Sequence, residues 1–362
     1  MSKIISIGTA NPPYRHEQRE ILKFMQNVFA LNDSDARKIG FLYRQSGIET
    51  RYSVIADYSR NINDWKFYPK TENLEPFPSL EQRMTWFAKY AAPLSVDAIR
   101  RCINKKIRSE EITHLITVSC TGMSAPGLDL QIIELMQLQK NIFRTSINFM
   151  GCYAAIHALK LANSIAISEP EARILIVCTE LCTLHFQYEP SMDNISSSLL
   201  FSDGSAAVLV VNDGDPAKGL RLESFHAEIQ SKGKKDMAWE LSSTGFLMTL
   251  SNYIPELIQE DFKAFTMNAL SKASLAPSSI SHWCIHPGGK RILDVVGNSL
   301  GVSDKLGLCY DVLRLFGNMS SATILFVLEK ILSEIEHSKR NRVFAAGFGP
   351  GLTLESFIAE AC

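Results

Sequence analysis

Short apolar runs, each bounded by turn-forming residues, recur along most of the chain. Such runs are typical of buried strands, and the longer stretches between them carry apolar residues at helical spacing. The predicted strands cover 4–8, 111–120, 147–149, 173–178 and 208–211. The predicted helices cover 80–103, 132–138 and 154–166. Ser79 with Gln82 should cap the first helix, and Pro93 should kink or split it. Apolar strands that alternate with helices predict a layered α/β fold with mostly buried sheets.

A turn cluster at 212–216, Asn-Asp-Gly-Asp-Pro, predicts a boundary between two halves, 1–217 and 218–362. Three segments of the first half recur in the second, in the same order and at nearly the same spacing. The matches pair 112–114 with 280–282, 149–155 with 315–321, and 173–177 with 342–346. The repetition predicts two copies of one αβ unit, packed on each other about a pseudo-two-fold axis.

Cys152 lies at one of two turns that this repetition makes equivalent. It follows Gly151 at a predicted strand-to-helix turn, where unpaired backbone N–H groups and the helix dipole favour a thiolate. This interpretation makes Cys152 a nucleophile, and the alternative is a small buried hydrophobe, as most free cysteines are. Asn318 occupies the equivalent strand-to-helix turn of the second half, so the packing of the two copies can bring both side chains to one centre.

His286 stands at the end of a predicted strand, directly before the rigid turn Pro287-Gly288-Gly289. An imidazole beside a cysteine stabilises the thiolate, which is the usual origin of a reactive thiol. The imidazole N–H and the Asn318 amide can both donate hydrogen bonds to a developing oxyanion, and losing one such donor costs about 3 kcal/mol. The three residues together predict a reactive cysteine beside an oxyanion site.

Composition and charge indicate which partners to expect. The formal net charge is −1, so nothing suggests nucleic acid or an anionic membrane surface as the main partner. No stretch is long and apolar enough to predict a membrane span, and the first apolar run is too short for a secretory signal. The eight cysteines are spread through apolar segments and are expected to be reduced thiols of a cytoplasmic protein. No Gly-x-Gly-x-x-Gly motif opens a helix, which argues against a dinucleotide-binding pair.

With these motifs the sequence resembles the type III polyketide synthases, the chalcone synthase-like family of the thiolase fold. The resemblance runs from 8–12 to 347–353 and rests on four motifs in order. These are Gly-Cys at 151–152, His-Pro-Gly-Gly at 286–289, Gly-Asn-Met-Ser-Ser at 317–321 and Gly-Phe-Gly-Pro-Gly at 347–351. The resemblance implies a duplicated thiolase-like fold with αβαβα layers. It places the family's Cys–His–Asn triad on Cys152, His286 and Asn318.

The resemblance also implies a set of residues that line the substrate cavity. They comprise the gatekeeper phenylalanine, a second gatekeeper position, three cavity threonine positions, a position that is small in the plant enzymes, and one residue from each of the last two motifs. In that order they are Phe201, Met248, Cys120, Cys182, His185, Trp239, Ser320 and Gly349. For Met248, Cys120 and Cys182, plain core packing is an equal alternative. The glycine-rich loop at 347–351 is expected to let the backbone approach substrate closely, because no helix or Lys-Ser/Thr follows it.

The family's cationic mouth of the coenzyme A tunnel matches Arg37 and Arg44 in this sequence. Gly40 stands at the third basic position, and Lys38 is the candidate substitute. From their spacing alone, these basic residues are better interpreted as a solvated helix face.

The resemblance implies an acyltransferase that loads an acyl-CoA starter on Cys152 and extends it repeatedly with malonyl-CoA. The segment 237–246 and the helix 81–103 are more similar to bacterial alkylpyrone and alkylresorcinol synthases, which implies an aliphatic starter and a pyrone or resorcinol-type product. No cofactor or metal is implied, since both reacting partners are thioesters. A homodimer is expected, with 121–127 at its interface.

Three other interpretations stay open at this point. A ketoacyl-ACP synthase III or a hydroxymethylglutaryl-CoA synthase shares the fold and a cysteine nucleophile, but stops after one condensation. A papain-like protease also uses Cys, His and Asn, but lacks the duplication and needs an open peptide cleft. A non-catalytic acyl- or CoA-binding module would have a Cys152 without special reactivity.

Overall fold

The computed structural model describes residues 1–29, 32–71, 73–233, 235–251, 253–336 and 341–362. In the first half, five described strands belong to the main sheet: β1 (Ser2–Ala10), β4 (His114–Ser119), β5 (Phe143–Asn148), β6 (Arg173–Leu181) and β7 (Asp203–Asn212). The second half adds β8 (Leu220–Ile229), β11 (His282–Ile285), β12 (Arg342–Gly349) and β13 (Thr353–Ala361). Together they form one mixed sheet in the order β11-β12-β13-β8-β1-β7-β6-β4-β5.

This sheet consists of two related parts that meet at β1 and β8. In the first part β1 pairs antiparallel with β7, and β7 pairs antiparallel with β6. In the second part β8 pairs antiparallel with β13, and β13 pairs antiparallel with β12. Finally, β6 pairs parallel with β4 in the first part, and β12 pairs parallel with β11 in the second. The junction itself is a short antiparallel contact in which Ser2–Ile4 face Leu220–Leu222. The same pairing on both sides confirms the predicted duplication, while the exact division at residue 217 stays a prediction.

The two parts differ at their outer edges. β5 extends the first part beyond β4, whereas no described strand lies beyond β11 in the order of the sheet. The helix α9 (Gly307–Phe316) precedes Asn318 instead, and its buried Cys309, Val312 and Leu313 recur at helical spacing. The prediction that a strand precedes Asn318 is therefore wrong. The prediction that a helix follows it is correct, as it is for Cys152.

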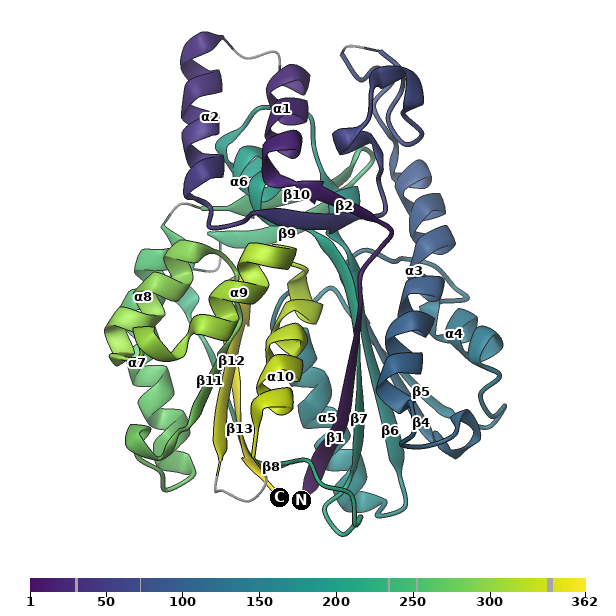
Figure 1. Ribbon diagram of the computed structural model, residues 1–362, viewed down its shortest axis with the longest axis vertical. Coiled ribbons are helices and arrows are strands. Elements are labelled where there is room, and N and C mark those ends of the chain that lie inside the picture. Colours follow the sequence, from purple (N-terminus) through teal and green to yellow (C-terminus); the bar gives the residue numbers. More distant parts are fainter. Residues whose placement is uncertain (30–31, 72, 234, 252, 337–340) are drawn as a thin grey trace.

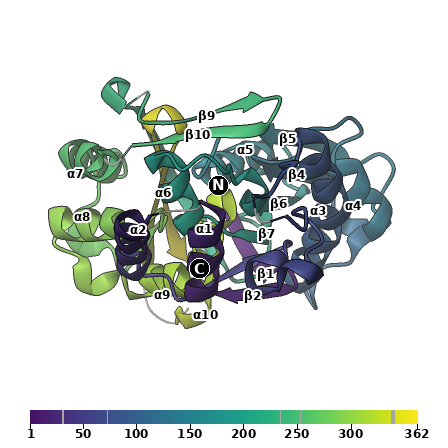
Figure 2. The same ribbon diagram turned by 90° about the horizontal axis from the view of Figure 1, so that it is seen from above.

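Helices lie between the two parts of the sheet and cover its outer faces. The central pair, α5 (Ala154–Ser168) and α10 (Thr323–Glu334), contacts strands of both halves. The outer face of the first half carries α3 (Leu80–Ile103) and α4 (Leu128–Met136). The second half carries α7 (Ile254–Lys272) and α8 (Lys290–Leu300) on the opposite side of the molecule (Figures 1 and 2). The result is the expected αβαβα succession of layers.

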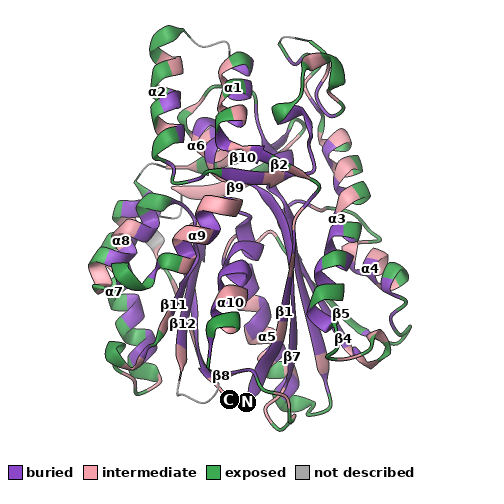
Figure 3. Ribbon diagram, viewed as in Figure 1, coloured by how far each residue is buried: buried purple, intermediate pink, exposed green. Residues whose placement is uncertain are grey.

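Burial follows the same layers. The central strands are buried almost throughout their length, whereas the outer helices bury one face only (Figure 3). One hydrophobic cluster joins α5 and α10 to strands of both halves, so the halves share a core. α3 begins after Ser79, whose hydroxyl accepts a hydrogen bond from the Gln82 N–H at 3.2 Å, as predicted. The helix continues through Pro93 and is not split there, because Pro93 is exposed and solvent can satisfy the carbonyl that it leaves unbonded.

A further layer covers the upper end of the sheet in Figure 1. Its helices are α1 (Gln18–Val28), α2 (Asp33–Gln45) and α6 (Met192–Leu200). Its strand pairs are β2 (Tyr14–Glu17) with β3 (Thr50–Ser53), and β9 (Met237–Ser242) with β10 (Gly245–Leu250). Below this layer the parallel strands end, which is where α/β proteins commonly bind ligands. Among the described helices, none combines the length and the hydropathy needed to traverse a bilayer.

Candidate active site

A cavity of about 700 Å³ lies where the upper layer meets the carboxyl ends of the strands. Ligand pockets typically measure about 300–1,000 Å³, so this one can hold a substrate. Cys152 enters it from the loop before α5, His286 from the end of β11, and Asn318 from the turn before α10. The structure therefore brings together, from both halves, the three residues that the sequence motifs singled out.

Gly151 allows Cys152 to approach this cavity. Its φ of +80° lies in the left-handed region, which favours glycine. A Cβ atom at this position would lie 2.1 Å from Cδ of Pro350, so any side chain would collide with the glycine-rich loop. The loop at 347–351 and the turn at Cys152 are thus packed directly against each other.

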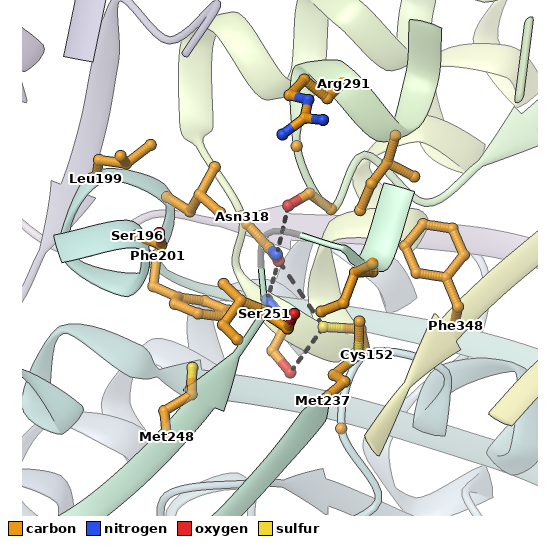
Figure 4. Close-up of a pocket in the computed structure, with 18 of the residues that line it drawn as sticks. Cys152, Ser196, Leu199, Phe201, Met237, Met248, Ser251, Arg291, Asn318 and Phe348 are labelled. Carbon is orange, nitrogen blue, oxygen red and sulfur yellow. Dashed lines mark hydrogen bonds between the residues drawn. The ribbon is translucent and has the colours of Figure 1, made fainter. Parts of the chain in front are cut away.

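Asn318 is held in one orientation by its neighbours. Its Oδ1 accepts a hydrogen bond from the Ser320 N–H at 2.9 Å, and its Nδ2 donates to the Gly288 carbonyl at 3.3 Å. The Cys152 Sγ lies 4.0 Å from Asn318 Oδ1 and 3.7 Å from Ser320 Oγ. Figure 4 shows the Cys152 and Asn318 side chains pointing toward each other. The second hydrogen of Nδ2 remains available for a substrate oxygen. The backbone of Asn318 also forms a β-bridge with the backbone of Phe201, which holds the Phe201 side chain beside the site.

His286 is fully buried, and its ring packs edge-on against Phe348 at a centroid distance of 5.4 Å. Its backbone N–H donates to the Ala346 carbonyl at 2.9 Å, which ties the residue to β12. Neither ring nitrogen has a hydrogen-bond partner among the described residues. Burial lowers the pKa of His286 to about 3, so the imidazole is neutral near pH 7. A neutral ring with two unengaged nitrogens can accept one proton and donate another.

The surroundings of Cys152 favour the neutral thiol over the thiolate. Burial raises its pKa to about 12, and the Glu180 carboxylate acts in the same direction, while hydrogen bonds with Ser320 and Asn318 act against it. The expected low pKa is therefore wrong, because α5 begins only at Ala154 and the cavity wall removes water from the sulfur. The proton has to leave during the reaction, and His286 is the base available in the same cavity.

Glu180 is a buried carboxyl group behind this site that the motifs did not indicate. Its Oε1 accepts a hydrogen bond from the Ser321 hydroxyl at 2.5 Å, and its Oε2 accepts one from the Cys120 N–H at 2.9 Å. Burial raises its pKa from 4.5 to about 7. A carboxylate at the end of an otherwise apolar strand was the only sequence signal for it.

This raised pKa has a consequence for stability. The folded protein holds the Glu180 proton more tightly than the unfolded chain, so the contribution to stability is complete below pH 4.5 and is lost as the pH rises through about 7. Taken alone, this group lowers the free energy of unfolding by up to roughly 3 kcal/mol between pH 5 and pH 8, whereas the buried His16, His185 and His286, whose pKa values are lowered, act in the opposite direction as the pH rises to 6.5. Glu180→Gln should remove this fall, so that stability rises more steeply with pH in denaturant melts of the variant than in those of the wild type, while the contributions of Asp203, whose pKa is raised to about 6, and of the histidines remain. An unchanged slope in the variant would contradict this assignment.

Comparison with known proteins decides the family. A family model described as "Chalcone and stilbene synthases, N-terminal domain" matches residues 1–214, and one described as "Chalcone and stilbene synthases, C-terminal domain" matches residues 221–362. The chain belongs to the chalcone and stilbene synthase family. Its identification as a type III polyketide synthase from the four motifs is thereby confirmed.

Individual relatives agree with this assignment. "Alpha-pyrone synthesis polyketide synthase-like Pks18" of Mycobacterium tuberculosis is 30% identical over 99% of this chain and 90% of its own length. "Probable polyketide synthase 1" of Dictyostelium discoideum is 31% identical over 98% of this chain, which spans only 11% of that protein. The crystal structure of PKS-I from the brown alga Ectocarpus siliculosus superposes with a TM-score of 0.92 at 28% identity, covering 100% of this chain and 98% of that one. The expected thiolase-like fold is confirmed.

Most of the cavity positions inferred from the family resemblance do line the cavity. They are Phe201, Met248, Cys120, Cys182, His185, Trp239 and Ser320. Trp239 and Met248 face each other across β9 and β10, and His185 stacks on Phe246 at 4.1 Å. Their contact with substrate stays a prediction, and for Met248, Cys120 and Cys182 so does the alternative of a packing role alone.

Gly349 and the three basic residues of α2 are not among the residues that line the cavity. Gly349 is not part of the lining, and its missing side chain instead leaves room for Tyr153 and the Cys152 backbone. Arg37, Lys38 and Arg44 are exposed and are not among the residues that line the cavity, so their role at the mouth of a coenzyme A tunnel stays a prediction. Lys38 shares a helix face with Gln45, which does line the cavity, but it lies two turns further out and pairs with a carboxylate of its own helix.

The cavity also has lining residues that the motifs did not indicate. From α2 and the start of α7 come Leu42, Gln45, Ser46, Ile254 and Pro255. Lys290 and Arg291 follow the His-Pro-Gly-Gly turn at the start of α8. Their position, as two adjacent cations directly after the His-Pro-Gly-Gly motif, could have indicated them from the sequence. No group of three or more His, Cys, Asp or Glu side chains in the described part of the chain is arranged to hold a metal ion.

Proposed function

We propose that this chain builds a polyketide by repeated decarboxylative condensation of malonyl-CoA onto an acyl-CoA starter held on Cys152. The observation that carries the proposal is the meeting of Cys152, His286 and Asn318 at one cavity, contributed by both halves of the chain. Membership of the chalcone and stilbene synthase family supports it.

Loading of the starter uses Cys152 and His286. The imidazole accepts the thiol proton, and the resulting imidazolium and thiolate stabilise each other as opposite charges. The sulfur attacks the thioester carbonyl of the starter, the bond from that carbon to the coenzyme A sulfur breaks, and coenzyme A leaves as a thiol after taking the proton from His286. The acyl group is then a thioester of Cys152.

Extension uses His286 and Asn318 as hydrogen-bond donors. The bond between the malonyl carboxylate and its carbon breaks, carbon dioxide leaves, and the electron pair forms an enolate of the thioester. The enolate oxygen accepts hydrogen bonds from the imidazole N–H and from Nδ2 of Asn318, the kind of preorganised contact that lowers a barrier by about 3 kcal/mol per donor. The enolate carbon attacks the Cys152 thioester, and the bond from the acyl carbon to the Cys152 sulfur breaks. The extended chain is now a thioester of coenzyme A, and Cys152 attacks that thioester, displaces coenzyme A and carries the chain into the next round. Cyclisation of the finished chain to a pyrone or resorcinol-type product completes the reaction.

An aliphatic starter fits the cavity best. Apolar side chains of β9, β10 and α6 form much of its wall: Met237, Trp239, Met248, Leu250, Leu199 and Leu200. An acyl chain placed against them gains about 25 cal/mol for each Å² of apolar surface removed from water. We also propose that the reaction needs no cofactor, since the thioesters themselves supply both the nucleophile and the electrophile.

A homodimer is part of the proposal, and the edge strand β5 is its expected interface together with 121–127. β5 is the last strand of the sheet in the described chain, and Phe143 on it is 65% exposed. An unprotected edge of this kind invites pairing with a second copy. Sedimentation of the purified protein should give the mass of a dimer, and replacing Phe143 with lysine should shift it towards the monomer. A wild-type protein that sediments as a monomer would refute this part.

Product analysis tests the function as a whole. The purified protein is incubated with malonyl-CoA and a series of straight-chain acyl-CoAs, with an aromatic acyl-CoA for comparison, and products are identified by mass spectrometry. We expect products extended by more than one ketide unit, formed most rapidly from the aliphatic starters. Products that stop after one extension would favour a single-condensation enzyme, and a preference for the aromatic starter would contradict the proposed starter class.

A further inference from the structure

The charged side chains of the cavity gather at one place. Among its described lining residues, the cations are Lys290 and Arg291, and Asp294 is the acidic residue. All three belong to the first turns of α8. The remainder of the lining is apolar or uncharged, apart from His185 and His286, whose pKa values are lowered by burial. An anionic part of a substrate in this cavity therefore has one place to bind.

Lys290 and Arg291 lie at the solvent end of the cavity. The side chain of Lys290 is 45% exposed and that of Arg291 is 63% exposed, whereas His286, four residues before Lys290, is fully buried. Figure 4 shows the Arg291 guanidinium above Asn318 and Cys152, with Met248 on the other side of the site. The cavity thus passes from cations in contact with water, through the reactive residues, to apolar side chains.

Both cations are paired, but weakly. Lys290 Nζ lies 2.7 Å from Asp294, whose carboxylate also accepts a hydrogen bond from the Tyr310 hydroxyl at 2.7 Å. Arg291 Nη2 lies 2.7 Å from Glu256 of α7. Exposed ion pairs of this type contribute about 0–1 kcal/mol, so a phosphate can replace or share them at little cost. Lysine has three N–H donors and arginine has five, which leaves donors free even while these pairs persist.

We propose that Lys290 and Arg291 bind the phosphate groups of coenzyme A thioesters at the mouth of this cavity. The thioester has to reach Cys152 at the buried end, and the phosphates at the other end of the same molecule then lie at the exposed end, among these two side chains. A guanidinium and an ammonium are the groups that bind phosphate most strongly in proteins. The proposal rests on the use of coenzyme A thioesters set out above. It gives the role expected of Arg37, Lys38 and Arg44 to two residues of the opposite half of the chain.

Calorimetric titration with coenzyme A itself tests this directly, because binding does not require turnover. The variant Lys290→Ala/Arg291→Ala should bind coenzyme A about ten- to a hundredfold more weakly than the wild type, since each lost hydrogen bond with a charged partner is worth roughly a tenfold change. Pantetheine, which lacks the nucleotide and its phosphates, should bind both proteins equally. Both residues are exposed, so the variant should fold, and its melting temperature verifies this.

Two matched variants serve as controls. Arg37→Ala/Arg44→Ala removes two exposed cations of α2, the helix to which the family resemblance assigns this role, and should weaken coenzyme A binding less than the Lys290/Arg291 variant does. Glu256→Gln frees Arg291 from its carboxylate and should strengthen binding. The proposal is overturned if the Lys290/Arg291 variant binds coenzyme A as well as the wild type does, if its loss is equal for pantetheine, or if the α2 variant shows the larger loss. A wild type that binds coenzyme A but forms no condensation product would instead refute the proposed function and leave this site standing.

Discussion

Replacing Cys152 with alanine abolishes condensation in our account, with a loss of at least about 10⁴-fold in kcat. The reason is that the sulfur both receives the starter and carries the growing chain, so no other group in the cavity can substitute for it. The neighbouring thiols of Cys120 and Cys182 are buried, and their pKa values are raised well above the ordinary value by burial. The measurement is product formation from malonyl-CoA and an acyl-CoA starter.

Cys362 provides the matched control, because it and Cys152 are the two cysteines in the described chain that are not fully buried. Cys362→Ala should retain full activity, and iodoacetamide should inactivate the wild type and this variant equally. A Cys152→Ala protein that still joined malonyl-CoA to a starter would remove the basis of the whole mechanism.

Replacing His286 with alanine should impair two separate steps. Without the His286 imidazole, the proposed acceptor of the Cys152 proton is missing, and the pKa of about 12 leaves almost no thiolate at neutral pH. Decarboxylation also loses one of its two donors to the enolate oxygen. We expect each step to slow by about 10²–10⁴-fold. Acylation of Cys152 in a single turnover, and release of carbon dioxide from malonyl-CoA, measure the two steps independently.

His282→Ala is the control for this variant, since His282 lies on the same strand at its other end and contacts Asn341 at 3.3 Å. It should keep both rates near those of the wild type. If His286→Ala slowed loading but released carbon dioxide at the wild-type rate, the imidazole would be a base only, and Asn318 alone would have to hold the enolate.

The sequence predicted those parts of the molecule that depend on local pattern or on its repetition. Apolar strands, the capped helix after Ser79 and the duplicated unit follow from residue spacing, and the duplication brings Cys152 and Asn318 to one centre. The structure departs from these expectations at α9, because a stripe of buried residues at helical spacing outweighs the similarity of 315–321 to 149–155.

Features that depend on tertiary environment were not predictable in the same way. The raised pKa of Cys152 and the lowered pKa of His286 come from burial, which no motif records. The carboxyl group of Glu180 reaches the site through hydrogen bonds with Ser321 and Cys120, which are distant in sequence. Lys290 and Arg291 line the cavity from α8, and no motif indicated them, because the helix that contributes a side chain to a cavity is decided by how the two halves pack.

Mass spectrometry of the intact protein, followed by peptide mapping, shows whether Cys152 carries both the starter and the growing chain. After incubation with an acyl-CoA alone, we predict one acyl group per chain, attached to the peptide that contains Cys152. After a brief addition of malonyl-CoA, the mass on that same peptide should increase by ketide units, and in Asn318→Ala it should stay at the starter. An acyl group on any other residue, or products released without an adduct on Cys152, would contradict the account.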